Sequence, residues 1–316
     1  MNKDMLNQNE KIKRLIENVE QVIVGKRETI NLVVAAMLAG GHVLIEDVPG
    51  VGKTQLVSAI AKSCEGQFGR LQLTPDVMPS DITGYTMIDQ TTHNTEFRKG
   101  AVFCNFLIAD EINRASPKSQ SALLEIMEEG QVSVDGNTYV LPKPFMVLAT
   151  QNPVETYGTY HLPEAQMDRF IMKISVGYPN RQDELDIMMR NERNISAKTL
   201  HSVITCEDVV SLAESVKEVS CSDAVRDYIV DIVEATRKED YIKLPVSPRG
   251  SIALYKMAKA YAFVLGREYV LPDDVKFLAP FVLSHRIILT PKGKSLADTT
   301  EGAINAILAK IPVPVR

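Results

Sequence analysis

The sequence predicts an α/β core followed by an all-helical second domain, and three observations support this fold class. Continuously apolar runs recur in the first half of the chain, at residues 42–46, 105–110 and 145–150, and helix-like segments separate them. Continuous apolar strands that alternate with helices are typical of a parallel sheet covered on both faces. The second half of the chain instead carries helical spacing. A chain of 316 residues accommodates both parts, which we place at residues 1–177 and 178–316.

The core opens with helical periodicity. Ile12, Leu15, Ile16 and Val19 fall on one face of a helix predicted over residues 9–22. Apolar periodicity, with glycine or proline at the ends of elements, predicts the rest of the core. These elements are helices over 28–39, 53–63 and 117–129, and strands over 42–46, 70–73, 105–110, 145–150 and 171–176.

Residues 131–141 interrupt the alternation of strands and helices. Two short β-type runs flank Asp135-Gly136, a dipeptide that strongly favours a hairpin turn. We therefore expect a hairpin that projects from the sheet. The character of the chain then changes near residue 178, where helical spacing takes over. The expected helices of the second domain cover residues 181–192, 207–219, 222–238, 249–265 and 273–284.

Composition limits the classes of function. Hydrophobic residues make up 45% and charged residues 24% of the chain, as is ordinary for a globular protein. The 40 acidic residues outnumber the 35 basic ones, whereas general nucleic-acid binding needs a basic surface, so nucleic acid is not an expected partner. The sequence has no apolar run long enough for a membrane span, no signal-peptide pattern and no CxxC pair among its four cysteines. We expect a cytoplasmic protein with reduced thiols.

The main chemical signal lies between an expected strand and an expected helix. It is the run Pro49, Gly50, Val51, Gly52, Lys53 and Thr54. Backbone N–H groups of a glycine loop, together with the positive end of the following helix, bind polyphosphates such as ATP. Lys53 is expected to reach the β- and γ-phosphates, and the Thr54 hydroxyl to hold Mg²⁺. Asp47 replaces a glycine of the strict pattern, a departure that the two remaining glycines make tolerable.

An acidic pair ends another apolar strand. An acid at the carboxyl end of a strand in an open α/β sheet points into the ligand crevice. Asp110 is expected to hold Mg²⁺ through water, and Glu111 to act as the base that polarises the attacking water. Asn152 follows the next apolar strand, and its amide is a candidate to orient this water or to contact the γ-phosphate.

Two arginines complete the set of candidate residues. Arg169 lies just before the strand expected over residues 171–176, and Arg249 opens a helix after Ser247-Pro248. A guanidinium at a helix N-terminus strengthens an anion-binding site. Taken alone, each arginine is better explained by a surface salt bridge, and only the other motifs favour a functional role.

Together these segments resemble the MoxR family of AAA+ ATPases, and the likeness spans roughly residues 10–312. A lone P-loop is shared by many families, but this ordered set of motifs is specific. The motifs are EDVPGVGKT at 46–54, LTPDVMPSDITG at 73–84, ADEINRASP at 109–117, ATQNP at 149–153, LPEAQMDRF at 162–170, SPRG at 247–250 and His285-Arg286.

The resemblance implies an AAA+ P-loop core followed by a lid of four or five helices. It adds Gln55 to the nucleotide-binding residues and implies that Val24 and Gly25 lie near the adenine. Residues 131–141 then correspond to the insert before the sensor 1 motif, and residues 76–100 to a second insert that faces the pore or the partner side.

The resemblance also implies roles for four polar residues. Asn152 is then sensor 1, Arg249 is sensor 2, and Arg169 is the arginine presented to ATP on a neighbouring subunit. Arg114 is a second candidate for such a contact. An arginine that acts in trans requires a homo-oligomer, usually a hexameric ring. Members of this family are chaperone-like remodelers that often work with von Willebrand factor A domain proteins in cofactor insertion or complex maturation.

The sequence therefore predicts Mg²⁺-dependent hydrolysis of ATP to ADP and phosphate that drives remodeling or maturation of partner protein complexes. Two other functions stay open. A DNA-dependent AAA+ motor is disfavoured by the net charge of −5. A non-hydrolysing nucleotide-binding switch gains slight support from the departure at Asp47, and Glu111 and Asn152 count against it.

Overall fold

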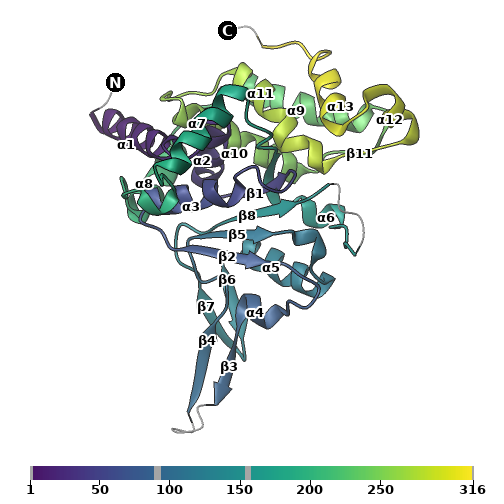
Figure 1. Ribbon diagram of the computed structural model, residues 1–316. Helices are drawn as coiled ribbons and strands as arrows, with labels where there is room; N and C mark the ends of the chain where they lie inside the picture. The colour runs from purple at the N-terminus through teal and green to yellow at the C-terminus, as the bar shows by residue number, and fades with distance from the viewer. Residues whose placement is uncertain (1–2, 89–93, 154–157, 315–316) are drawn as a thin grey trace.

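The computed structural model describes residues 3–88, 94–153 and 158–314, and in these residues five parallel strands form the central sheet. The strand order is β2-β5-β8-β1-β9, with every neighbouring pair parallel. The strands are β1 (His42–Glu46), β2 (Phe68–Gln72), β5 (Phe106–Asp110), β8 (Met146–Gln151) and β9 (Phe170–Ile174). The predicted parallel α/β core is confirmed, and Figure 1 shows helices on both sides of it.

Successive residues of a strand face opposite sides of this sheet, as the strand period of two requires. Val43 and Ile45 join the apolar cluster on one face, whereas Leu44 between them joins the cluster on the other. Both faces are apolar because both are covered. The first face carries α1 (Lys3–Glu20), α2 (Arg27–Leu38) and α3 (Lys53–Ser63), and the second carries α4 (Pro79–Thr83) and α5 (Pro117–Glu129).

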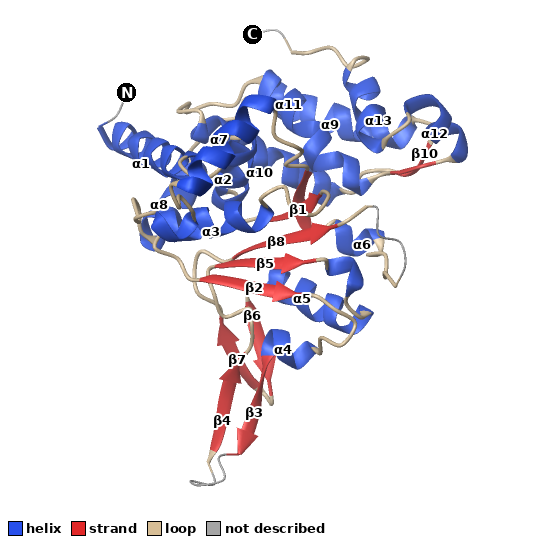
Figure 2. Ribbon diagram, in the orientation of Figure 1, coloured by secondary structure: helices blue, strands red, loops and turns tan. Residues whose placement is uncertain are grey.

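Two antiparallel hairpins project from the second face, as Figure 2 shows. The hairpin predicted around Asp135-Gly136 is confirmed by β6 (Gln131–Val134) and β7 (Asn137–Val140). The other, β3 (Gly84–Ile88) with β4 (Thr95–Lys99), lies in the segment 76–100, of which residues 89–93 are outside the described residues. Its strands were not predicted, since they bury almost no side chains and so lack an apolar period. Phe97 stacks on Tyr139 with ring centroids 3.9 Å apart and joins the two hairpins.

The C-terminal part is helical, as predicted, and adds a small sheet. Among its described helices, six begin at side-chain caps. The capping residues, which each accept a backbone N–H of the first turn, are Asn180, Thr205, Ser222, Ser247, Thr290 and Thr299. The helices are α7 (Arg181–Glu192), α8 (Cys206–Val216), α9 (Asp223–Lys238), α10 (Pro248–Val264), α11 (Pro272–Leu283), α12 (Pro291–Ala297) and α13 (Thr300–Leu308). The last two, and the antiparallel pair β10 (Ile242–Leu244) and β11 (Ile288–Leu289), were not predicted.

Short helical turns complete the chain. They are α6 (Glu164–Met167) and the 3-10 turns η1 (Ile112–Arg114), η2 (Ala197–Thr199) and η3 (Ser284–Arg286). In the part of the chain that the structure describes, no helix has the length and apolar character needed to cross a membrane.

The N-terminal helices join the sheet to the C-terminal helices. One apolar cluster runs from Ile12 in α1 through Val43 in β1 to Leu254 in α10. At its rim, Lys11 in α1 forms an ion pair of 2.6 Å with Asp208 in α8. The division of the chain at residue 177 stays a prediction, because this packing is continuous across it.

Candidate functional site

The carboxyl ends of three neighbouring strands define the candidate site. β8 lies between β1 and β5 in the sheet, and the three strands are parallel, so their carboxyl ends lie at one edge. A cavity of about 320 Å³ opens there. Its lining consists of Pro49, Gly50, Gly52, Lys53, Thr54, Gln55, Arg70, Gln72, Asp110, Glu111, Thr150 and Asn152.

The loop between β1 and α3 depends on two glycines. Gly50 and Gly52 both have φ of +90°, a backbone conformation that other residues rarely adopt. Gly52 is the N-cap of α3, whose first turn contains no acidic residue. The positive end of the helix therefore faces the cavity without a neutralising carboxylate in that turn, which favours an anion.

Lys53 lies inside this loop rather than in solvent. Its Nζ donates to the carbonyl oxygens of Asp47 at 2.9 Å and Val48 at 3.3 Å. Partial burial lowers the pKa of Lys53, and the nearby carboxylates of Asp47, Asp110 and Glu111 oppose this shift. A charged phosphate is a stronger acceptor than the two neutral carbonyls, so the ammonium group is well placed to bind one.

Asp47, the departure from the glycine pattern, has a structural explanation. Its buried carboxylate accepts the backbone N–H groups of Val176 at 2.5 Å and Gly177 at 2.9 Å, and the hydroxyl of Ser175 at 3.2 Å. Asp47 therefore ties the start of the loop to the segment that leads from β9 to α7. It does not line the cavity, so its carboxylate does not occupy the space where an anion would bind.

Asp110 is the last residue of β5 and is buried. Arg70 donates its Nε–H to Oδ2 of Asp110 at 3.0 Å. The Thr150 hydroxyl donates to Oδ1 at 3.4 Å. These contacts fix the carboxylate at the wall of the cavity that also contains Thr54.

Glu111 follows with a left-handed backbone, φ +59°. Such a conformation costs a non-glycine residue about 1–3 kcal/mol and is common at functional sites. The Glu111 N–H donates to the Thr150 hydroxyl at 2.9 Å. Its Oε2 accepts from Nε2 of Gln72 at 3.0 Å and from Nη1 of Arg114 at 3.1 Å. The carboxylate is thus held at the cavity by two side chains.

Sequence reasoning missed Arg70, Gln72 and Thr150. A strand was predicted over residues 70–73, but its neighbour in the sheet was not. Only the pairing of β2 with β5, which places Gln72 opposite Asp110, shows that Arg70 and Gln72 reach the acidic pair. The available signal was the spacing of Arg70 and Gln72, which are two residues apart and so place two polar side chains on the same face of a strand.

The donor set fits Mg²⁺ bound together with a phosphate. The Thr54 hydroxyl and the Asp110 carboxylate line the same cavity and are hard oxygen ligands. Mg²⁺ is usually held by one or two protein oxygens, with phosphates and water as its other ligands. Among the described residues, no group of three or more His, Cys, Asp or Glu side chains is placed to hold a metal ion.

Five residues predicted for the site do not line this cavity. They are Val24, Gly25, Val51, Arg169 and Arg249. Val51 packs against the main apolar cluster. Gly25 has φ +68°, and a side chain there would collide with the Asp183 carboxylate of α7. The turn after α1 is therefore in close contact with the first C-terminal helix.

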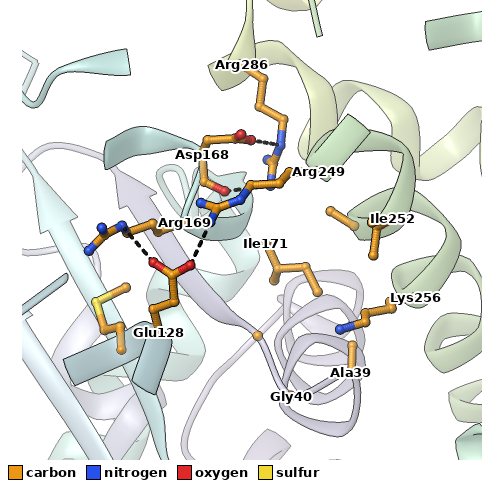
Figure 3. A pocket seen from close by; sticks show the side chains of 13 residues that line it. Ala39, Gly40, Glu128, Asp168, Arg169, Ile171, Arg249, Ile252, Lys256 and Arg286 are labelled. Atoms are coloured by element: carbon orange, nitrogen blue, oxygen red, sulfur yellow. Dashed lines mark hydrogen bonds and ion pairs between the residues drawn. The ribbon is translucent and has the colours of Figure 1, made fainter. Parts of the chain in front are cut away.

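Arg169 and Arg249 instead meet in a second cavity, of about 210 Å³, shown in Figure 3. Both contact the carboxylate of Glu128 at the end of α5. Nη2 of Arg249 lies 2.6 Å from Oε1, and Nε of Arg169 lies 3.4 Å from Oε2. The structure thus brings together two arginines that are far apart in the sequence.

Asp168, beside Arg169, is held by the C-terminal helices. Nε of Arg286 forms an ion pair of 2.8 Å with its Oδ1, and the Ser247 hydroxyl donates to its Oδ2 at 2.9 Å. Arg286 is buried, and burial lowers its pKa to about 10 although Asp168 opposes the shift. It also donates to the carbonyl oxygen of Phe170 at 2.8 Å. This network fixes the segment that carries Arg169.

Known proteins share this architecture. Residues 42–172 match the family described as ATPase family associated with various cellular activities (AAA), and residues 234–307 match the AAA lid domain. The uncharacterized protein YeaC of Bacillus subtilis is 50% identical over 96% of this chain and 95% of its own length. Chaperone MoxR1 of Mycobacterium tuberculosis is 40% identical over 96% of this chain and 82% of its own length. A crystal structure from Cytophaga hutchinsonii, described provisionally as an ATPase, matches with a TM-score of 0.91 and 41% identity, covering 98% of this chain and 97% of that chain.

Proposed function

We propose, from the premise that this chain belongs to the MoxR family of AAA+ ATPases, that it hydrolyses Mg²⁺-ATP at the P-loop cavity to remodel partner proteins. The chain is an ATPase by family. The observation that carries the site assignment is that Lys53, Asp110, Glu111 and Asn152 line one cavity at the start of α3. The chaperone-like action is supported by the 40% identity to Chaperone MoxR1.

Each residue of the cavity has a proposed task. Lys53 and the backbone of the glycine loop bind the phosphates, with Gln55 beside them. Thr54 and Asp110 hold Mg²⁺, which neutralises charge on the transferred phosphoryl group. Glu111 activates the attacking water, and Asn152 orients it. Glu111 does this from a fixed position, since Gln72 and Arg114 hold its carboxylate.

Val24 and Gly25 are proposed to bind the adenine. They lie outside the P-loop cavity, in the turn between α1 and α2. The contact of Gly25 with Asp183 places this turn against α7, so a base bound there meets both the core and the helical part.

Arg169 and Arg249 are proposed to act on ATP bound to a neighbouring subunit. Neither lines the P-loop cavity of its own chain, and both converge on one carboxylate elsewhere. This arrangement supports a homo-oligomeric ring, for which we propose six subunits. A von Willebrand factor A domain protein as partner and a cytoplasmic location belong to the same proposal.

Of the two alternative functions, the non-hydrolysing switch loses support and the DNA-dependent motor stays disfavoured. The departure at Asp47, which favoured a non-hydrolysing switch, is accounted for by its contacts with residues 175–177. The net charge of −5 continues to disfavour a DNA-dependent motor.

The test compares ATP binding with ATP turnover in three variants. Glu111→Gln should keep the ATP affinity of the wild type and lose turnover by roughly 10²- to 10⁴-fold, the usual contribution of a general base. Lys53→Ala should lose ATP binding. Lys62→Ala, at the exposed far end of the same helix, is the matched control and should change neither property. Full turnover in Glu111→Gln would remove the proposed mechanism.

A further inference from the structure

The arginine cavity is organised around one carboxylate. Arg169 precedes β9 and Arg249 lies in the first turn of α10, so their side chains come from separate elements. Glu128 of α5 contacts both, with one carboxylate oxygen for each guanidinium (Figure 3). Through this carboxylate, α5, the segment before β9 and α10 are joined.

The position of Glu128 in α5 makes these contacts necessary. The C-terminal end of a helix carries partial negative charge and favours cations. The last turn of α5 holds Glu128 and Glu129 but no basic residue. The compensating cations at Glu128 must come from other elements, and Arg169 and Arg249 supply them. Glu129 does not line this cavity.

The charges around the cavity are not balanced. Asp168 and Arg286 neutralise each other in an ion pair. The other charged side chains among the described residues of the lining are Glu128, Arg169, Arg249 and Lys256. Three cations therefore face one carboxylate, and the surplus favours an added anion with more than one charge.

The arginines keep donors for that anion. A guanidinium has five N–H donors in a planar fork. The contacts with Glu128 use one nitrogen of each arginine. In Figure 3 the other nitrogens of Arg169 point away from Glu128. Bound to Glu128 on one side, the pair is able to bind a phosphate on the other.

We propose that Glu128 is a positioning residue that joins Arg169 and Arg249 into one clamp for the phosphates of ATP held by a neighbouring subunit. This inference rests on the proposed function. Glu128 does not touch the nucleotide, and its effect passes through the two arginines. Without its charge the guanidinium groups repel each other, and the clamp opens.

The experiment is a double-mutant cycle on the assembled full-length protein, with ATP turnover as readout. Glu128→Gln should lower kcat by roughly 10- to 100-fold, the cost of misplacing a group that contacts the reaction by about 1 Å. ATP affinity should stay unchanged. Glu129→Gln, with the same charge change in the same helical turn, should keep wild-type kcat. In an Arg169→Ala background, Glu128→Gln should lower turnover less than it does in the wild type, because only Arg249 is left for Glu128 to position.

The outcomes separate this inference from the proposed function. Equal kcat in Glu128→Gln and Glu129→Gln, beside an active wild type, would overturn the role of Glu128 alone. A loss that is just as large in the Arg169→Ala background would show a structural effect and would also overturn it. Increased turnover in Glu128→Gln would mean that the carboxylate restrains the arginines, again contradicting the proposal. A wild type without turnover at every protein concentration would remove the proposed function and this inference together.

Discussion

The two cavities of this molecule are built in different ways. Most of the P-loop cavity comes from residues 49–55 and from two acids that are adjacent in the chain. The arginine cavity joins the turn after α2, the end of α5, the start of β9 with the two residues before it, α10 and η3. A local motif is enough to recognise the first, whereas the second exists only after the sheet and the C-terminal helices have packed. The P-loop cavity is thus encoded by local sequence, whereas the pairing of the two arginines is encoded only by the fold.

Their charges differ in a complementary way. The P-loop cavity pairs Lys53 and Arg70 with Asp110 and Glu111, a balance suited to a metal–phosphate complex. The described lining of the arginine cavity has a cationic surplus, so it suits phosphate oxygens. We therefore propose that the two surfaces bind opposite sides of one nucleotide, each contributed by one of two neighbouring subunits.

The largest expected effect separates the two cavities directly. Arg169→Ala should lower turnover by roughly 10³- to 10⁵-fold, the value of an arginine that stabilises phosphoryl transfer in trans. ATP affinity should not change, because Arg169 does not line the P-loop cavity. Arg226→Ala, which removes an exposed arginine of α9, is the control and should be fully active. Loss of ATP binding in Arg169→Ala would show that the cavities are not independent.

A smaller effect tests how the arginine cavity is held together. Arg286→Met should lower the free energy of unfolding by about 3–5 kcal/mol, since it leaves the poorly exposed carboxylate of Asp168 without its cation. Urea unfolding measures this change. Ser247→Ala removes one hydrogen bond to the same carboxylate and should cost only about 1 kcal/mol. Equal losses in both variants would contradict the central place of Arg286.

The smallest effect concerns pH. His42 is buried and neutral: Nδ1 accepts the Val147 N–H at 3.0 Å, and Nε2 lies 2.8 Å from the Met127 carbonyl oxygen, next to Glu128. Burial lowers the pKa of His42 to about 4. The folded pKa is below the unfolded value of about 6.5, so its contribution is complete above pH 6.5 and is lost as the pH falls toward 4.

The loss from His42 should approach about 3 kcal/mol at pH 4, following 1.36 kcal/mol per pKa unit. Burial also lowers the pKa of His285, so this second histidine adds to the pH dependence of the wild type. The free energy of unfolding of His42→Gln, measured between pH 7 and pH 4, should depend on pH less steeply than that of the wild type. An unchanged slope would mean that His42 is not buried in the neutral form.

The sequence predicted the parts of this fold that local chemistry determines. The helix over Pro117–Glu129 was placed to the residue, because Pro117 and Gly130 mark its ends. The hairpin at Asp135-Gly136 followed from its turn. The exposed strands β3 and β4, and the short helices α12 and α13, carry weaker signals and were missed.

The other features that the sequence did not predict depend on contacts between distant segments of the chain. Gln72 reaches Glu111 only because β2 pairs with β5, a choice that no single segment encodes. In the sequence, Glu128 is one of several acidic residues at the end of a helix. Its proposed role became visible only through its ion pair with Arg249, which is far away in the chain. The structure grouped the P-loop residues with the acidic pair as expected, and it separated Arg169 and Arg249 from them.

The most direct test of a site shared between subunits is a mixing experiment. Arg169→Ala and Glu111→Gln are each expected to form inactive rings. In a mixed ring, a P-loop cavity with intact Glu111 meets an intact Arg169 wherever the two variants are neighbours in the right order. We predict that equal amounts of the two variants, assembled together with ATP, regain a substantial part of wild-type turnover. Mixtures that stay as inactive as the separate variants, although they assemble together, would contradict the shared site.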